Sequence, residues 1–221
     1  MLARNPVLSR SELLAGLDQE TVETLSALAE VRTFSPHEQI VEEGQKAEFI
    51  FCVTSGLVRL TKKESAGREA DVSICEPGDV FGEYLVAGGA TYAHGAWAAE
   101  FTEIVMFDLK RLRSLAQQHH GIQRNIIHIM AQHLLGALDC IAGDRLHTAA
   151  QRVANYLVAR CPPSVSRVTL RLPYQKRILA GKLGLAPEAL SRAFAALAPL
   201  GVAVKGKNIY VESVSLLKDA C

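Results

Sequence analysis

Near the C-terminus, Ser191 and Arg192 follow Glu188 by three and four residues, in a segment typical of a helix. At that spacing the three side chains share one helix face. A carboxylate can accept a hydrogen bond from cytosine N4, and a guanidinium can contact guanine O6 and N7 as a fork. Ser191 can serve a base or a phosphate. The group has the chemistry to read DNA bases, although Glu188 and Arg192 could instead form a surface ion pair.

The segment from Lys176 to Ala195 has the pattern of a helix-turn-helix. Ala180 is small where two helices would cross, and Gly184, four residues on, can adopt the positive φ of a sharp turn. Four apolar residues fall where the motif needs inward side chains, namely Leu179, Leu183, Leu185 and Leu190. Pro173 is expected to open the first helix and Pro187 the second. An αα-hairpin of purely structural use is the alternative.

The start of the second helix is expected to meet the bases, because a recognition helix enters the major groove by its N-terminal end. The residues exposed there would be Pro187, Glu188, Ala189, Ser191 and Arg192, whereas Leu190 and Phe194 would point into the core. Downstream, residues 202–204 and 209–211 flank a basic tip and predict a wing suited to backbone phosphates. The expected phosphate contacts are Lys176, Arg177, Lys182, Lys205 and Lys207.

Charge separates this C-terminal part from the rest of the chain. Residues 1–147 have 13 Lys and Arg against 20 Asp and Glu, a net charge of −7, whereas residues 148–221 have 11 against 3, a net charge of +8. A compact basic unit favours a polyanionic partner such as double-stranded DNA. A basic face without a ligand is the alternative.

Residues 31–106 contain short apolar runs separated by Gly, Pro and charged pairs. Strands are expected at 39–41, 49–53, 57–60, 72–74 and 104–107, a spacing that suits a barrel or jelly roll better than a parallel sheet. A short amphipathic helix is expected before them over residues 18–29, with Leu25 and Leu28 inward. The predicted fold class is therefore α+β.

A helix over 109–117, capped by Asp108, is expected to precede a much longer one over 121–146. In the long helix, apolar residues step by three and four in the rhythm of a coiled-coil seam, namely Ile127, Met130, Leu134, Ala137 and Ile141. Ile126, Ile129 and Leu138 form a second stripe. One stripe can cover the barrel and the other can meet a partner helix in a homodimer. A helix buried twice within one monomer would show the same stripes.

The predicted organisation is an effector-sensing barrel over residues 1–120, a dimerisation helix over 121–146 and a winged helix-turn-helix over 147–221. No apolar stretch approaches the length of a membrane span and no secretion signal is visible, so a cytoplasmic protein is expected. The five cysteines include no Cys-x-x-Cys pair, which predicts neither a disulfide framework nor a zinc site.

Three stretches resemble the Crp/Fnr superfamily of bacterial transcription regulators. Residues 40–56 are similar to the paired glycine turns of a cyclic-nucleotide-binding barrel, and residues 77–83 to the segment that follows them. Glu188 with Ser191 and Arg192 resembles the recognition helix of the Fnr branch. The resemblance implies a cyclic-nucleotide-binding-like jelly roll, and a homodimeric activator that binds inverted repeats of TTG-type half-sites and contacts RNA polymerase.

Residues 172–174 and 180–199 resemble more closely the NnrR and Nnr regulators of denitrification genes, which implies nitric oxide as effector and haem as a possible cofactor. The candidate effector pocket contains Gly82, Glu83, Tyr92 and His94, and His94 or Tyr92 could ligate iron. No metal site is assigned.

Two departures limit the resemblance. Tyr92-Ala93 stands in the region where cyclic-AMP receptors have an Arg-Ser pair, and residues 1–51 contain no cysteine, so an iron–sulfur cluster is not expected. A cyclic-nucleotide-responsive regulator with a different phosphate anchor is an alternative. A cupin-like metalloenzyme would need more barrel histidines than His37 and His94. Because no catalytic motif is found, an enzyme is not expected.

Overall fold

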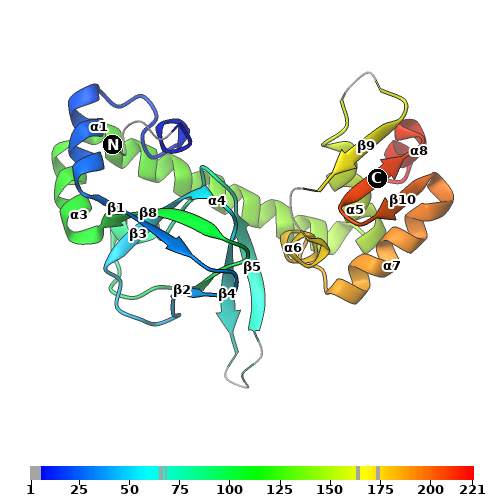
Figure 1. Ribbon diagram of the computed structural model, residues 1–221, viewed down its shortest axis with the longest axis horizontal. Coiled ribbons are helices and arrows are strands. Elements are labelled where there is room, and N and C mark those ends of the chain that lie inside the picture. The colour runs from blue at the N-terminus through cyan, green and yellow to red at the C-terminus, as the bar shows by residue number, and fades with distance from the viewer. Residues whose placement is uncertain (1–5, 65–66, 68, 163–164, 173–174) are drawn as a thin grey trace. The chain divides into compact units, whose positions relative to one another are not determined.

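The computed structural model describes residues 6–64, 67, 69–162, 165–172 and 175–221 (Figure 1). It divides into two compact units, Met1–Gly136 (unit 1) and Ala137–Cys221 (unit 2). The predicted α+β class is confirmed, with a β-sheet domain, a long helix and a C-terminal helix-turn-helix domain. Pro173, which was expected to open the first helix of the helix-turn-helix, lies outside the described residues, as does Tyr174.

Unit 1 contains a jelly roll made of two four-stranded antiparallel sheets, in the orders β1-β8-β3-β6 and β2-β7-β4-β5. The strands are β1 (Ala29–Phe34), β2 (Gln39–Val41), β3 (Phe49–Ser55), β4 (Val58–Lys63), β5 (Glu69–Cys75), β6 (Val80–Phe81), β7 (Gly95–Ala98) and β8 (Thr102–Asp108). Sequence analysis found five of these strands and missed β1, β6 and β7.

The two sheets enclose an apolar core to which both contribute. On β4, Val58 pairs with Ala98 and Leu60 with Ala96, so these four small and branched side chains share the inner face of their sheet. Strand β3 is buried almost throughout. Its side chains belong to a core to which helices and the second sheet both contribute, which explains why the strand is a nearly continuous apolar run. Burial of this apolar surface is the main term that holds the barrel together.

Helices close unit 1 around the barrel. They are the 3-10 helix η2 (Leu8–Arg10), α1 (Gln19–Ala27), α2 (Tyr84–Ala87), α3 (Leu109–Gln118) and the first part of the long α4 (His120–Leu146), whose residues from Ala137 onward belong to unit 2. As predicted, Asp108 caps α3 by accepting a hydrogen bond of 2.8 Å from the Arg111 N–H. The prediction of a helix up to residue 29 is wrong at its end, because β1 begins at Ala29 and pairs with β8.

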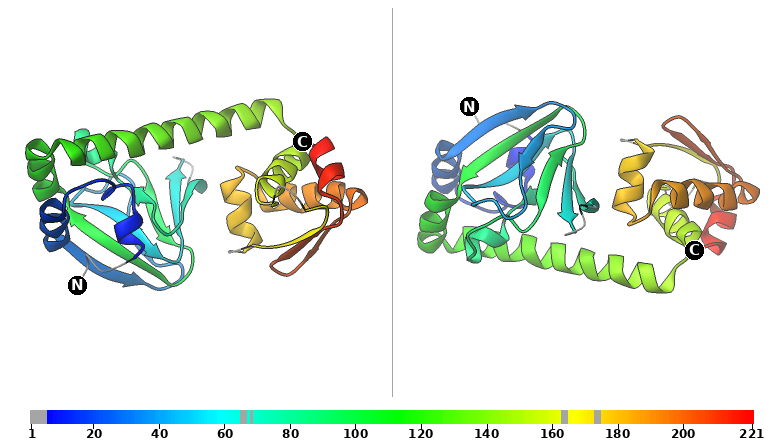
Figure 2. Two further views of the ribbon diagram at one scale, coloured as in Figure 1. Left: turned by 90° about the horizontal axis from the view of Figure 1, so that it is seen from above. Right: turned by 90° about the horizontal axis from the view of Figure 1, so that it is seen from below.

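Helix α4 is one unbroken helix (Figure 2). Ile122, Ile126 and Ile129 are buried in the core of unit 1, and the Asn125 amide donates to the Leu13 and Ala15 carbonyls at 3.0 and 2.9 Å. Among the described residues α4 is also long and apolar enough to cross a membrane by length and composition alone, which sequence analysis did not anticipate.

Unit 2 is a helical domain with a three-stranded antiparallel sheet in the order β10-β11-β9. Its elements are α5 (Ala149–Val158), β9 (Val168–Arg171), α6 (Lys176–Lys182), α7 (Pro187–Leu197), η3 (Ala198–Leu200), β10 (Val202–Lys205), β11 (Asn208–Val211) and α8 (Val214–Asp219). Thr148 and Gln151 form a capping box at the start of α5, which packs against α7 and α8.

Candidate nucleic-acid interface

The turn between α6 and α7 has the predicted geometry. Gly184 adopts a φ of 60°, in the left-handed region that favours glycine. The Leu185 N–H donates to the Ala180 carbonyl at 2.8 Å, which closes the turn over the small residue. Leu179, Ala180 and Leu190 are buried as expected, whereas Leu183 and Leu185 are only half-buried.

Helix α7 presents a polar face to solvent and an apolar face to the core. Pro187 occupies its first turn, where a missing N–H costs little. Of the five predicted base-facing residues, Pro187, Glu188, Ser191 and Arg192 are exposed and Ala189 is half-buried. The buried residues are Leu190, Ala193, Phe194 and Leu197. The N-terminal face of α7 is therefore free to approach a ligand.

The exposed side chains of α7 are ready to form new contacts. Ser191 Oγ donates to the Pro187 carbonyl at 3.0 Å, which leaves its oxygen able to accept. Among the described residues, no ion pair joins Glu188 to Arg192. The alternative of a surface ion pair between them gains no support from the structure.

The expected phosphate contacts lie on two elements. Lys205 and Lys207 are exposed on either side of Gly206, which has a φ of 61° at the tip of the β10–β11 hairpin. Lys176 and Arg177 are exposed in the first turn of α6, while Lys182 at its end is half-buried. The hairpin forms the predicted wing.

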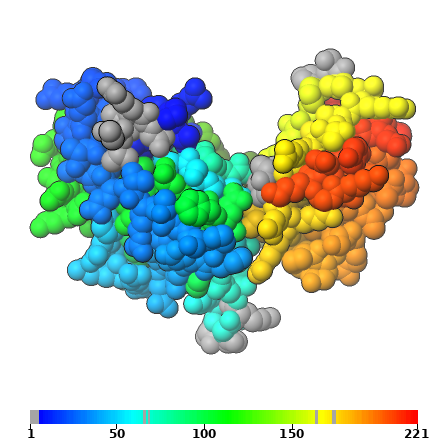
Figure 3. All heavy atoms as spheres, in the orientation of Figure 1, coloured from blue at the N-terminus to red at the C-terminus, as the bar shows by residue number. Residues whose placement is uncertain are grey.

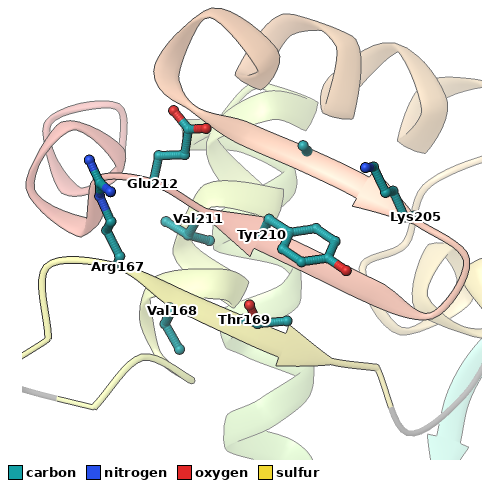
Figure 4. Close-up of a pocket in the computed structure, with 8 residues that line it drawn as sticks. Arg167, Val168, Thr169, Lys205, Tyr210, Val211 and Glu212 are labelled. Atoms are coloured by element: carbon teal, nitrogen blue, oxygen red, sulfur yellow. The ribbon is translucent and has the colours of Figure 1, made fainter.

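A groove of about 440 Å³ lies on the outer face of the winged sheet. Tyr210 stands at its centre between Thr169 and Ala203, its partners on the neighbouring strands, with Arg167 and Lys205 towards opposite ends (Figure 4). The Lys205 ammonium is 5.9 Å from the Tyr210 ring centre. Figure 3 shows this sheet, in yellow and orange-red, on the near surface of unit 2. Sequence analysis did not identify the groove.

Sequence analysis also missed Arg152, a residue of α5 that supports the helix-turn-helix. Its side chain is only 14% exposed and donates through Nη2 to the Leu183 carbonyl, while Nη1 lies 2.6 Å from Asp144 Oδ1. Nothing in the local sequence indicates this role. Leu183 is 31 residues away along the chain, and Asp144 belongs to a different helix, α4.

The predicted dimer seam is exposed in the single chain. Ile127, Leu134 and Ile141 are 66%, 62% and 49% exposed, Met130 is half-buried and Ala137 is exposed. In the second predicted stripe Ile126 and Ile129 are buried, but Leu138 is 51% exposed, so that stripe covers the barrel only in its first part. Helix α4 thus has one buried face and one apolar face open to solvent.

In unit 1, the candidate effector residues lie after β6 and before β7. Glu83 is buried and its Oε1 is 2.9 Å from Nδ1 of His133 on α4. Gly82 has a φ of 81°, which a turn at this point requires. Sequence analysis did not single out His133, whose contact with Glu83 comes from packing of α4 on the barrel.

Tyr92 and His94 differ in how their side chains are used. The Tyr92 hydroxyl accepts from the Glu48 and Phe49 N–H groups at 3.3 and 3.1 Å and donates to the Phe49 carbonyl at 3.1 Å. Burial raises the pKa of Tyr92, although these backbone hydrogen bonds oppose the shift. Burial, together with the charge of Lys62, lowers the pKa of His94, whose ring meets Tyr84 edge-on.

Two domain models match the chain. A cyclic nucleotide-binding domain covers residues 31–119 and a Crp-like helix-turn-helix domain covers residues 151–220. The crystal structure of a candidate cyclic nucleotide binding protein from Ruegeria pomeroyi is 31% identical, over 98% of this chain and 96% of that one, with a TM-score of 0.66. The chain belongs to the Crp/Fnr family of DNA-binding transcription regulators.

Named regulators of the family are also similar to this chain. The nitrogen fixation regulation protein FixK of Rhizobium meliloti is 28% identical over 73% of this chain and 72% of its own. The structure of FixK2 from Bradyrhizobium japonicum is 27% identical, over 87% of this chain and 96% of that one, with a TM-score of 0.72. In this Crp/Fnr regulator, the residues matched by the two domain models lie in separate units.

The residues of this Crp/Fnr regulator fit a haem ligand at one of the two expected positions. The Tyr92 phenol does not fit, because the backbone of Glu48 and Phe49 uses both its donor and its acceptor capacity. His94 does fit, since its lowered pKa favours the neutral imidazole that binds iron, and no hydrogen bond occupies its ring among the described residues.

Proposed function

We propose that this chain is a homodimeric activator that binds an inverted repeat of TTG-type half-sites in double-stranded DNA. The observation that carries the proposal is the polar face at the start of α7, where Glu188, Ser191 and Arg192 are exposed above a buried Leu190 and Phe194. Such a face can enter the major groove without disturbing the core of unit 2.

In this proposal Arg192 contacts a guanine as a fork and Glu188 accepts from a cytosine amino group. Glu188 is one of only three acidic residues in the basic segment 148–221. A carboxylate there would weaken phosphate binding through repulsion unless it reads a base. Lys205 and Lys207 of the wing, with Lys176 and Arg177, contact the backbone and set the register.

The exposed seam of α4 supplies the two-fold axis. Pairing of two α4 helices would bury Ile127, Met130, Leu134, Ala137 and Ile141 and set two recognition helices about 34 Å apart, one turn of DNA. Half-sites related by a two-fold axis then match the protein. Bound in this way, the dimer would contact RNA polymerase at the promoter.

Fluorescence anisotropy with a TTG inverted repeat tests the proposal. The matched control is the same duplex with both half-sites scrambled, and a second duplex carries about five extra central base pairs, half a helical turn. Specific binding should be lost in both controls. Equal affinity for all three duplexes in competitor DNA would overturn the proposal.

We also propose nitric oxide as the effector, sensed through haem, with nitrogen-oxide genes as targets. Support comes from the resemblance of residues 180–199 to denitrification regulators and from the available imidazole of His94. The test is the absorption spectrum of protein purified with haem, before and after anaerobic nitric oxide. A Soret band that shifts with nitric oxide and is lost in His94→Ala supports it; a protein that stays free of haem contradicts it.

A cyclic nucleotide is the second candidate effector, and the match of residues 31–119 to a cyclic nucleotide-binding domain favours it. Glu83 is the acceptor on which a ribose hydroxyl could bind, in exchange for His133. Calorimetry with cyclic AMP and cyclic GMP decides between the candidates, with Glu83→Gln as the control that should remove any heat of binding.

A further inference from the structure

The turn of the helix-turn-helix lies against the guanidinium of Arg152 on α5 and in ordinary contact with the last turns of α4. A Cβ placed on Gly184 would lie 2.9 Å from Arg152 Nη2, 3.7 Å from Asp144 Oδ1 and 3.8 Å from Cys140 Sγ. Cys140 and Asp144 are four residues apart, hence on one face of α4. That face forms a seat for the turn, and all of its residues belong to unit 2.

Arg152 joins the two sides of this seat. One end of its guanidinium donates to the carbonyl of Leu183, the residue that caps the C-terminus of α6. Carbonyls at a helix end have no partner within the helix, so this hydrogen bond satisfies a group that would otherwise need water. The other end of the guanidinium pairs with Asp144 at 2.6 Å.

An arginine at position 152 can contact Asp144 and the Leu183 carbonyl at the same time. The Arg152 side chain is 14% exposed, so its charge needs a partner nearby, and Asp144 supplies one from the last turn of α4. The planar guanidinium can serve both partners at once, whereas a lysine ammonium has no such fork. The position of the Leu183 carbonyl therefore depends on where the end of α4 lies.

We propose that Arg152 is a positioning residue for DNA recognition, which holds the turn before α7 to the end of α4 through Asp144. A shift of the α4 end then moves the turn, and with it the base-reading face of α7. The inference rests on DNA binding by the Crp/Fnr fold and needs neither a particular effector nor the TTG sequence. It gives α4 a second role beside its exposed seam.

The test compares Asp144→Asn with Asp139→Asn, a control of the same residue type on an exposed position of α4. The probe is a duplex selected from a random library by the wild-type protein. The result therefore does not depend on whether the half-sites are of the TTG type. For Asp144→Asn we expect about a tenfold loss of affinity for the selected duplex, with little change for a scrambled one. Asp144→Glu, which keeps the carboxylate, should restore part of the loss.

Hydrogen exchange of the full-length protein separates positioning from general stability. In Asp144→Asn the amides of residues 183–185 should exchange faster, while those of the buried part of α7 keep wild-type protection. Wild-type exchange in the turn, or wild-type affinity for the selected duplex, would overturn the inference. An equal loss of both affinities together with a lower unfolding midpoint would also overturn it, because Asp144 would then only stabilise unit 2.

Discussion

Glu83 Oε1 lies 2.9 Å from Nδ1 of His133 and joins the turn after β6 to α4. The Glu83 side chain is 8% exposed and that of His133 is 48% exposed. The hydrogen bond to Glu83 raises the pKa of His133; burial opposes the shift, and the charges of Glu83, Asp79 and Glu12 add to it. The contact between barrel and helix is thus strongest when His133 is protonated.

Stability of unit 1 should therefore depend on pH through His133. A raised folded-state pKa means that the contribution is complete below the ordinary pKa of 6.5 and is lost as pH rises through the raised value. Urea unfolding followed by the fluorescence of Trp97, the single tryptophan, reports on unit 1. We expect His133→Gln to cost most stability at about pH 5.5 and least at about pH 8.5.

The control for this experiment is His128→Gln. His128 lies 4.0 Å from Glu12, and both side chains are more than half exposed, so solvent screens the pair. Its substitution should therefore cost little stability in urea unfolding. A His133→Gln profile parallel to wild type at every pH would show that the Glu83 contact does not titrate in this range.

Arg192→Ala should relax specificity more than it weakens general DNA binding. Loss of a guanidinium fork on guanine costs about 1–3 kcal/mol of discrimination at one base position. The measurement is anisotropy against duplexes in which each base pair of one half-site is changed in turn. We expect the variant to become indifferent at a single position; uniform weakening at every position would assign Arg192 to a phosphate instead.

Lys205→Ala in the wing should have the opposite signature. Because a lysine on a phosphate releases counterions without reading a base, affinity should fall for all duplexes alike. A plot of log affinity against log salt should become shallower by about one unit. Lys218→Ala is the matched control, since Lys218 is exposed on α8, outside the wing. An unchanged salt slope for Lys205→Ala would remove the wing from the interface.

The helix-turn-helix was predictable because its determinants are local. Ala180, Gly184 and the buried Leu190 act through short-range geometry, and their spacing is visible in the sequence. Strand β1 was not predictable in this way: its burial increases only at Phe34, and it is a strand because β8 pairs with it. Strand β7 is built from Gly, Ala and a tryptophan, without the branched residues that indicate strands.

The roles of the candidate site residues were also hard to predict from sequence, because their partners are distant along the chain. The residue type of Tyr92 suggests an iron ligand, but its hydroxyl is used by the start of β3, more than forty residues earlier. His133 and Arg152 lie on helix positions that look solvated in sequence, and each gains its role from a contact with another element. Residue type and periodicity indicate which face a side chain occupies and leave its partner undetermined.

Gly184→Ala should destabilise unit 2, whereas Gly143→Ala should not. Alanine at a φ of 60° is strained, and its Cβ would lie 2.9 Å from Arg152 Nη2, so we expect a loss of about 1–3 kcal/mol. Gly143 lies within α4 with nothing within 4 Å of its Cβ position, and alanine there should stabilise the helix by about 0.5–1 kcal/mol. Circular dichroism during urea unfolding measures both. A stability of Gly184→Ala equal to wild type would mean that the turn can shift away from its seat.

Leu134→Glu should dissociate the proposed dimer. Leu134 is 62% exposed in the single chain and central in the predicted seam, and a two-fold axis would place two copies of the substitution in one interface. Loss of two buried leucines and the approach of two carboxylates should raise the dimer dissociation constant about a hundredfold or more. Sedimentation velocity over a concentration series measures it.

Gln132→Glu, exposed on the face of α4 away from the seam, adds the same charge and should leave the dimer intact. If both variants stay dimeric, two chains meet through another surface, and the spacing of the recognition helices cannot be set by α4.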